Sequence, residues 1–481
     1  MRLEQDYIGQ KQIPDNVLYG IHALRAKENF PDTTNFHIEW YKAMGQVKLA
    51  YYLVYNDFKQ SVQENISNVK IKFLSDDVID ALIRAAEQVA QGQWFEHFIV
   101  PAIQGGAGTS INMNINEIIA NLALQKLGYK PGQYQIIDPI EHANIYQSTN
   151  DTVPTALQVA AMYLFLDLEE KINSTRNLLE QLEQKYRFNL RMGYTQLQEA
   201  VPTTFGKQFS AYAEALARDW WRVSKCIERI KFINLGASAI GTSISVPRYI
   251  VVEIVPRLRQ ITGLPLAQAE NLVEATQNKD SLVEVHAILK AHATNLEKMV
   301  SDLRLQASDL VGRGEVILPQ VQVGSSIMPS KVNPVIAEFV ISVAHKVYSN
   351  DMLISSLVGQ GQFELNAYLP VIGHALLDSI KLLIAANISL KEKMLKGLQV
   401  NAQIAYERLL RSPAIATALN SIIGYHKASK LAKEMRTSKC DIFQANRKLG
   451  VLPEERLKQL LAADKLLKKG FSVKDILLDD D

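Results

Sequence analysis

Residues 324–334 read Gly-Ser-Ser-Ile-Met-Pro-Ser-Lys-Val-Asn-Pro, and this stretch cannot form a helix. Pro329 and Pro334 lack a backbone donor and push the residue before each of them toward extended geometry. From Pro334 onward the pattern changes, because apolar residues recur at helical spacing: Ile336, Phe339, Val340, Val343, Val347 and Leu353. We expect Asn333 to cap this helix and Pro334 to be its first residue. The sequence therefore predicts a polar loop that leads into a helix N-terminus.

This loop gathers two hydroxyls, one ammonium and several backbone N–H groups at the positive end of a helix. Such a place can hold a carboxylate or a developing oxyanion. Hydrolase patterns fit poorly, because Ser325 lies in neither a Gly-x-Ser-x-Gly nor a Ser-x-x-Lys motif, and Pro329 separates it from Lys331. On these residues alone, a polar surface loop before a helix cap is an equally good interpretation.

The loop resembles, without a break, the signature Gly-Ser-Ser-x-Met-Pro-x-Lys-x-Asn-Pro of the aspartase/fumarase superfamily of lyases. The resemblance implies that Ser325 is the base that takes a proton from the substrate carbon. It also implies that Ser326, Lys331 and Asn333 bind substrate carboxylates. Serine is a poor base in water, so we expect loop amides and burial to stabilise its anion.

A second block begins with the glycine-rich residues 104–110. It is not a phosphate-binding loop, because the lysine that must follow the last glycine is missing. A glycine turn before a helix explains the glycines but not Asn112, Asn114 and Asn116, which alternate with apolar residues. Buried amides need partners, so a polar network is predicted here. The block resembles the family's Gly-Thr-Ser-x-Asn-Met-Asn-x-Asn-Glu, which implies that Thr109 binds substrate.

A third block, Gln-Ser-Thr-Asn-Asp-Thr-Val-Pro-Thr at residues 147–155, precedes a helical pattern from Leu157 to Tyr186. That pattern covers about thirty residues, or roughly 45 Å of helix, which is longer than a single small domain. Taken alone, Ser-Thr-Asn-Asp before a proline is most often a helix cap. The block also resembles the family's next signature, which implies that Ser148, Thr149 and Asn150 contact substrate.

A fourth block at residues 192–202 departs from the family pattern. The family usually reads Gly-Arg-Thr-His/Gln-Leu-Gln-Asp-Ala, so the resemblance places Thr195 and Gln196 on substrate-binding positions. Tyr194 stands where the arginine is usual. Tyrosine cannot supply the fixed cationic fork of a guanidinium, so we expect a change in packing or charge pairing at this point.

Composition excludes several classes of partner. The 481 residues are 47% hydrophobic with a net charge of +2, so neither disorder nor a nucleic-acid partner is expected. Cys226 and Cys440 have no metal-ligand spacing, and His286 and His292 are six residues apart on different helix faces, so no metal or cofactor is predicted. A charged N-terminus and the lack of a run of roughly 20 apolar residues predict a cytoplasmic protein without a membrane partner.

The resemblance extends from about Tyr7 to Leu461. It implies an all-α, mainly helical fold in three domains: a mostly helical N-terminal domain at 1–145, a long central helical bundle at 146–397 and a small C-terminal helical domain at 398–481. The C-terminal tail matches least, because Leu419-Asn420-Ser421 lacks the proline common there. Members of the family usually pack four chains together and build each site from three of them, so a homotetramer with shared sites is expected.

The family shares an anti elimination that yields fumarate. The Gly-Thr-Ser-x-Asn pattern at 108–112 resembles the form found in the aspartase branch, and Gln196 stands where fumarases carry histidine. The expected function is reversible elimination of ammonia from L-aspartate to give fumarate, with a serine base on a mobile loop. The alternatives are a fumarate hydratase, another lyase of the superfamily, or a non-catalytic relative, which would have lost Ser325 or Lys331.

Overall fold

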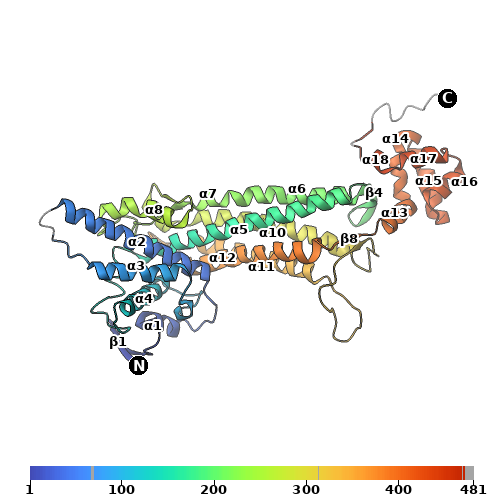
Figure 1. Ribbon diagram of the computed structural model, residues 1–481. Helices are drawn as coiled ribbons and strands as arrows, with labels where there is room; N and C mark the ends of the chain where they lie inside the picture. Colours follow the sequence, from blue (N-terminus) through green and yellow to red (C-terminus); the bar gives the residue numbers. More distant parts are fainter. Residues whose placement is uncertain (67–69, 313, 469, 472–481) are drawn as a thin grey trace. The chain divides into compact units, whose positions relative to one another are not determined.

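A computed structural model describes residues 1–66, 70–312, 314–468 and 470–471, and the chain is mainly helical, as predicted (Figure 1). It divides into two compact units, each assembled from separate segments of the chain. Unit 1 comprises Met1–Glu169, Trp221–Ala291 and His345–Ile384, and unit 2 comprises Glu170–Trp220, His292–Ala344 and Ala385–Asp481. The three domain ranges proposed from the sequence remain a prediction.

The N-terminal part of unit 1 is a small hairpin followed by packed helices. The elements are β1 (Arg2–Asp6), β2 (Gly9–Ile13), α1 (Ile21–Asn29), α2 (Ile38–Asn65), α3 (Asp76–Ala90), the short η1 (Phe95–His97) and α4 (Thr109–Lys126). In Figure 1 the blue helices α2 and α3 lie side by side. Their close approach requires glycine, because a Cβ at Gly45 would lie 2.3 Å from the Ala90 backbone nitrogen.

The rest of unit 1 is built from parts of long helices and short connecting elements. These are the start of α5 (Thr149–Lys185), α7 (Cys226–Ile230), β5 (Phe232–Ile233), α8 (Arg248–Thr262), β6 (Ala267–Gln268), α9 (Leu272–Gln277), the start of α10 (Asp280–Gln306), most of α11 (Val335–Val358) and most of α12 (Leu369–Ser389). β5 and β6 pair in parallel. The helix predicted to end near Tyr186 is therefore present as α5.

The helix α12 and the π-helical turn η2 (Leu390–Leu395) together are long and apolar enough to cross a membrane by length and composition. Within the described residues, 61% of the most apolar window of this segment is buried in the protein. A helix that is packed inside a bundle is apolar on all its faces, and this accounts for the composition.

Unit 2 carries an antiparallel hairpin and a cluster of short C-terminal helices. It contains the ends of α5, α10 and α12, the start of α11, and η2. It also contains β3 (Leu190–Thr195), β4 (Gln198–Thr204), most of α6 (Phe205–Ser224), β7 (Val316–Ile317), β8 (Gln399–Val400), α13 (Ala402–Arg411), η3 (Pro413–Leu419), α14 (Asn420–Ile423), α15 (Tyr425–Ser438), α16 (Ile442–Leu449), α17 (Glu454–Leu460) and α18 (Ala463–Leu466). β3 pairs with β4, and β7 with β8, both antiparallel.

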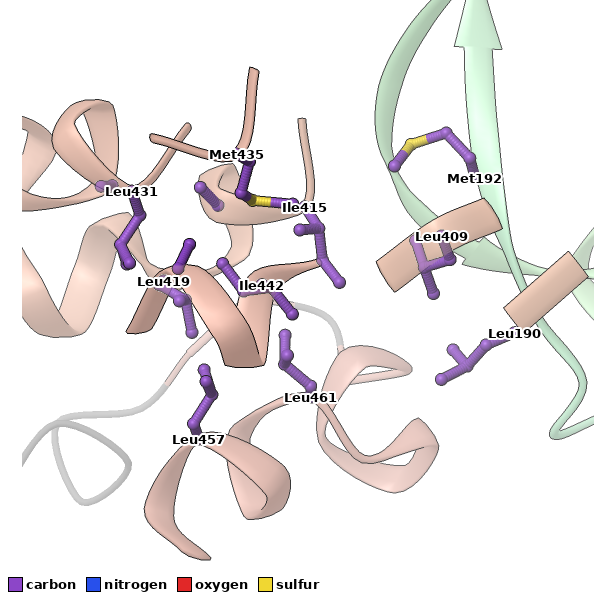
Figure 2. Close-up of a cluster of buried hydrophobic side chains, with 13 residues drawn as sticks. Leu190, Met192, Leu409, Ile415, Leu419, Leu431, Met435, Ile442, Leu457 and Leu461 are labelled. Carbon is purple, nitrogen blue, oxygen red and sulfur yellow. The ribbon is translucent and has the colours of Figure 1, made fainter. Parts of the chain in front are cut away.

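One apolar cluster joins the C-terminal helices to the hairpin. Figure 2 shows Leu190 and Met192 of β3 beside Leu409 of α13, with the remaining side chains on the following helices. Those remaining side chains include Ile415, Leu419, Leu431, Met435, Ile442, Leu457 and Leu461, all at most 2% exposed. The hairpin that bears two of the predicted site residues is therefore anchored at its base by an apolar core.

Candidate active site

The loop at residues 324–334 is not helical, as predicted, and α11 begins at Val335. The prediction that Asn333 caps this helix is wrong. Its side-chain amide instead donates to the Gly324 carbonyl at 2.8 Å, while the Gly324 N–H donates to the Lys331 carbonyl at 2.9 Å. The asparagine therefore ties the two ends of the loop together, and the Pro334 carbonyl accepts from the Glu338 N–H as the first helical bond.

Ser325 is partly buried in this loop, and its hydroxyl oxygen faces two backbone donors. The N–H groups of Ile327 and Met328 donate to Ser325 Oγ at 3.1 and 2.9 Å. Two amides directed at one oxygen stabilise negative charge there, and charged acceptors gain more from such bonds than neutral ones. Ser326 and Lys331 are exposed.

Thr109 and the third block meet where two helices begin. Thr109 is the exposed first residue of α4, after Gly108 with a left-handed φ of 93°. A Cβ at Gly108 would lie 2.9 Å from Val153 Cγ1 on α5, so the start of α4 packs directly on α5. Three residues after Thr109, Asn112 Nδ2 donates to Thr149 Oγ1 at 3.3 Å. The N-terminal ends of α4 and α5 therefore lie together in unit 1.

The helix-cap interpretation of the third block is correct for two of its residues. Ser148 Oγ accepts from the Asn150 N–H at 3.2 Å, and Asp151 Oδ1 accepts from the Ser148 N–H at 3.1 Å. This reciprocal arrangement closes the start of α5 in the manner of a capping box. It uses the side chain of Ser148 but not that of Thr149.

Asn150 is held by the turn at residues 234–242. Its side-chain amide donates to the Ala239 carbonyl at 2.7 Å, and its own carbonyl accepts from Asn234 Nδ2 at 2.9 Å. Pro154 has no N–H to give to that carbonyl, so Asn234 supplies the missing donor. The turn at residues 234–242 therefore supports the third block, which is predicted to contact substrate.

A polar network lies beneath these helix ends, as the alternating asparagines predicted. Its centre is Lys48 of α2, which is 0% exposed. The ammonium donates to Asn112 Oδ1 at 2.6 Å, to Gln147 Oε1 at 2.7 Å and to Asn144 Oδ1 at 3.2 Å. Burial lowers the pKa of Lys48 to about 7.

Sequence reasoning missed Lys48, although one signal was available. The lysine occupies a position on the apolar stripe of α2, which consists of Met44, Val47, Tyr51, Tyr52 and Tyr55. A charge on the buried face of a helix needs polar partners. No pattern in α2 alone indicates which partners these are.

Asp151 is the carboxylate next to this network, and it is also 0% exposed. Asp151 Oδ2 accepts from the Tyr51 hydroxyl at 3.0 Å and from the Ser238 N–H at 3.1 Å. Burial raises the pKa of Asp151 to about 6, although its hydrogen-bond donors favour the charged carboxylate and oppose this rise. The carboxylate therefore connects the start of α5 to α2 and to the 234–242 turn.

Thr195 and Gln196 are exposed where the β3–β4 hairpin turns. Gln196 and Leu197 have φ values of 51° and 60°, as a two-residue turn of the primed type requires. A cavity of about 550 Å³ lies beside this turn and is lined by, among others, Arg191, Tyr194, Gln196, Glu315 and Arg408.

Near Tyr194, the carboxylate of Glu315 pairs with an arginine from another element, and all three residues line this cavity. Arg408 Nη1 of α13 lies 2.6 Å from Glu315 Oε1, and Glu315 is 3% exposed. Burial raises the pKa of Glu315 above its usual value, and Arg408 opposes that rise. A guanidinium is therefore present next to the hairpin even though position 194 is tyrosine.

The ten predicted site residues thus fall into three groups. Unit 1 brings together Thr109, Ser148, Thr149 and Asn150. Unit 2 holds Ser325, Ser326, Lys331 and Asn333 on one loop, and Thr195 and Gln196 on the hairpin turn.

The two histidines considered as metal ligands are held between helices. His286 contacts Asp351 Oδ1 at 3.0 Å and Ser379 Oγ at 2.9 Å, and His292 contacts Asp219 Oδ2 at 3.0 Å. Among the residues for which the structure gives positions, no group of three or more His, Cys, Asp or Glu side chains is arranged to hold a metal ion.

Comparison with known proteins decides the family. The chain matches the family described as "Lyase" over residues 10–349 and the family described as "Fumarase C C-terminus" over residues 415–468. The chain belongs to the aspartase/fumarase superfamily of lyases. The predicted superfamily and the prediction of a lyase enzyme are both confirmed.

Relatives in this superfamily match the chain over nearly its whole length. A Bacillus sp protein named aspartate ammonia-lyase is 40% identical over 478 residues, with 98% of each chain covered. The protein of that name from Escherichia coli (strain K12) is 35% identical over 479 residues, again with 98% of each chain covered.

Solved structures show the same fold. A fumarate lyase:delta crystallin from Brucella melitensis has a TM-score of 0.89 at 35% identity, with 97% of this chain and 98% of that chain covered. A class II fumarase from Schistosoma mansoni has a TM-score of 0.85 at 26% identity, with 96% and 98% covered. These similarities agree with the mainly helical, multidomain fold expected from the sequence.

Proposed function

We propose that the protein is an aspartate ammonia-lyase, which eliminates ammonia reversibly from L-aspartate to give fumarate. The observation that carries this proposal is the position of Ser325, in an unbroken family signature, with two backbone N–H groups directed at its Oγ. Full-length relatives that bear the name aspartate ammonia-lyase support the choice of reaction within the superfamily.

In the proposed reaction Ser325, as its alkoxide, takes a proton from the substrate carbon next to one carboxylate. The electron pair of the broken C–H bond forms the double bond, and the C–N bond breaks on the opposite face with departure of ammonia. The proton held by Ser325 then passes to ammonia or to solvent, so fumarate and ammonium are the balanced products. The Ile327 and Met328 amides stabilise the alkoxide, which lowers the cost of using serine as a base.

The carbanion that forms on the way places extra negative charge on the neighbouring carboxylate. Hydroxyls, amides and one ammonium are suited to bind the two carboxylates and to stabilise this charge. The loop would contribute Ser326, Lys331 and Asn333, and the other two groups Thr109, Ser148, Thr149, Asn150, Thr195 and Gln196. The N-terminal ends of α4, α5 and α11 add the positive ends of three helix dipoles.

The proposal includes an assembly and a location. Because long helical stretches separate the site blocks along the sequence, we propose a homotetramer in which each active site takes residues from more than one chain. The expectation of a cytoplasmic enzyme without cofactor, metal, nucleic-acid or membrane partner belongs to the same proposal and rests on composition.

Fumarate hydratase is the second candidate, because a class II fumarase shares the fold at 26% identity. The two reactions are distinguished by incubating the pure protein with L-aspartate or with L-malate and following fumarate by its ultraviolet absorbance. Fumarate formation from L-aspartate at a rate far above that from L-malate is expected. Fumarate from L-malate alone would establish the hydratase, and no fumarate from either by the folded protein would indicate a non-catalytic relative.

A further inference from the structure

Lys48 is a buried cation whose hydrogen-bond partners are neutral. Its ammonium is 0% exposed, and it donates to the side-chain oxygens of Asn112, Asn144 and Gln147. Removal of a charge from water is costly unless an opposite charge or a full set of hydrogen bonds compensates it. Three amide oxygens satisfy the donors of the ammonium but do not neutralise its charge.

The partners of Lys48 belong to the segments that carry substrate-binding residues. Asn112 lies one turn after Thr109 on α4, and Gln147 directly precedes Ser148. Asn112 uses its oxygen to accept from Lys48 at 2.6 Å and its nitrogen to donate to Thr149 Oγ1 at 3.3 Å. The chain of bonds therefore runs from the ammonium through one amide to a hydroxyl of the proposed site.

We propose that Lys48 is a positioning residue, which supplies a buried positive charge beneath the helix ends at Thr109 and Thr149. The negative charge of a bound dicarboxylate stabilises the protonated form of Lys48, so dicarboxylate binding is accompanied by uptake of a proton from solvent. The inference rests on the proposed function, which places a substrate carboxylate at these helix ends. Lys48 itself does not touch the substrate; it polarises Asn112, and Asn112 in turn orients and polarises the Thr149 hydroxyl.

The environment of Lys48 sets the direction of the pH effect. Among the described residues, α4 and the 143–147 segment face it with Asn112, Asn144 and Gln147, and α5 brings the carboxylate of Asp151, whose charge raises the pKa that burial lowers to about 7. Tyr51, on the same helix as Lys48, donates to Asp151. Above pH 7 the free protein loses the ammonium charge, whereas a bound dianion favours its return. Dicarboxylate affinity should therefore fall as the pH rises above 7, with proton uptake on binding.

Calorimetric titration with succinate tests this. Succinate is a dicarboxylate that has no leaving group and stays doubly charged at pH 8. Heats measured at pH 8 in HEPES and in Tris, which differ in ionisation enthalpy, give the number of protons taken up. If binding raises the pKa of Lys48 by one unit, the wild-type protein takes up roughly 0.4 of a proton per site. Zero uptake by a wild-type protein that binds succinate would overturn the proposal.

Variants assign the proton to Lys48. Lys48→Met removes the charge with little change in side-chain length; it should abolish the proton uptake and weaken succinate about tenfold at pH 6.5. Lys59→Met is the matched control, because Lys59 is a lysine on the same helix that is 5% exposed and pairs with Asp76 at 2.6 Å, away from the site. The Lys59→Met variant should leave both the proton uptake and the succinate affinity unchanged. Equal proton uptake in Lys48→Met and wild type would contradict the assignment.

If Lys48→Met does not fold, a second variant can be used for the same test. Lys48→Gln retains an NH2 group that can donate to the amide oxygens but carries no charge, and it should show the same loss of proton uptake. Failure of this inference is separable from failure of the proposed function. A wild-type protein that forms fumarate from L-aspartate and binds succinate without proton uptake refutes only the role of Lys48, whereas absence of fumarate formation refutes the lyase assignment.

Discussion

Lys331 and Ser325 lie on the same loop, but they have different roles in the proposed reaction. Lys331 is exposed and is proposed to bind a substrate carboxylate throughout the reaction, whereas Ser325 is partly buried and acts only as the proton moves. A group that binds substrate and transition state alike affects affinity, and a group that acts only in the transition state affects turnover. Kinetic measurements on single variants therefore separate the two roles.

Lys331→Ala should raise KM for L-aspartate and lower kcat. An ammonium that binds a carboxylate contributes about 2–3 kcal/mol, so kcat/KM should fall roughly 30- to 160-fold. Steady-state kinetics at pH 8 measure the change. Lys427→Ala, at an exposed position on α15, is the control. An unchanged KM would mean that Lys331 points away from the substrate.

At the scale of single residues, the sequence nominates candidate site residues but predicts few of the hydrogen bonds that they make. The four signature blocks identify Ser325, Lys331 and the hydroxyl residues by their order. The bond between Asn333 and Gly324 was not predicted, because a cap and a loop clasp require the same residue type at the same place. Lys48 was missed because its partners lie in segments that are 64 to 99 residues away in the sequence.

At the scale of elements, helical periodicity predicts which segments are helices better than where they end. The apolar residues at helical spacing in α2 lie mainly between Trp40 and Tyr55, yet the helix continues to Asn65, although residues 56–65 are mostly polar. Phe58 and Val62 in this extension are at most 9% exposed, so tertiary packing extends the helix. The non-helical loop before α11 was predicted correctly because two prolines determine it.

The loop at 324–334 depends on glycine at its first position. A Cβ at Gly324 would lie 2.7 Å from the Lys331 carbonyl oxygen and 2.8 Å from the Asn333 nitrogen. Gly324→Ala should therefore displace the loop and lower kcat/KM on the order of 100-fold, while the melting temperature changes little. Gly359→Ala is the control, because its Cβ would meet the nearest atom only at 3.6 Å. Full activity of Gly324→Ala would show that the loop tolerates another path.

The contact between His37, which directly precedes α2, and His374 of α12 should make stability depend on pH. His37 Nε2 lies 2.8 Å from His374 Nδ1, and burial, followed by the charge of His374, lowers the pKa of His37 from 6.5 to about 4. The unfolded chain therefore binds more protons than the folded protein between these values. This contribution to stability is complete above pH 6.5 and is lost as the pH falls toward about 4; it amounts to at most about 3 kcal/mol.

Urea unfolding at pH 7 and pH 4.5 measures this loss. His37→Gln keeps a hydrogen-bonding side chain but cannot be protonated, so this variant should lose about 2 kcal/mol less than wild type between the two pH values. Carboxylates that protonate in the same range act equally on both proteins. The same loss in both would exclude the histidine pair as its source.

For the whole molecule, the family resemblance predicts the fold class, which agrees with relatives that cover nearly the full chain, and the order of the site blocks, which stays a prediction. Composition and periodicity cannot show how the three groups of site residues combine. In the proposed tetramer that combination depends on contacts between chains, which no pattern within one sequence specifies. Assembly is therefore the point at which the account needs a direct experiment.

Mixing two inactive variants tests the shared site. Thr195→Ala and Ser325→Ala proteins are dissociated together and reassembled, and mass spectrometry confirms that hybrids form. If these residues come from different chains, some hybrid sites contain both native side chains, and activity should return to a fraction of the wild-type value. Hybrids that stay as inactive as the parent proteins would place both residues in one chain's contribution to the site.

The rate of fumarate release from L-aspartate by the wild-type protein and by Ser325→Ala tests the central claim most directly. The account predicts that wild type produces fumarate and that Ser325→Ala lowers kcat about 100- to 10,000-fold with KM within about twofold. Ser330→Gly serves as the control on the same loop, because Ser330 already has a left-handed φ of 61° that glycine adopts readily, and it should keep its activity. A Ser325→Ala protein that releases fumarate as fast as wild type would contradict the account.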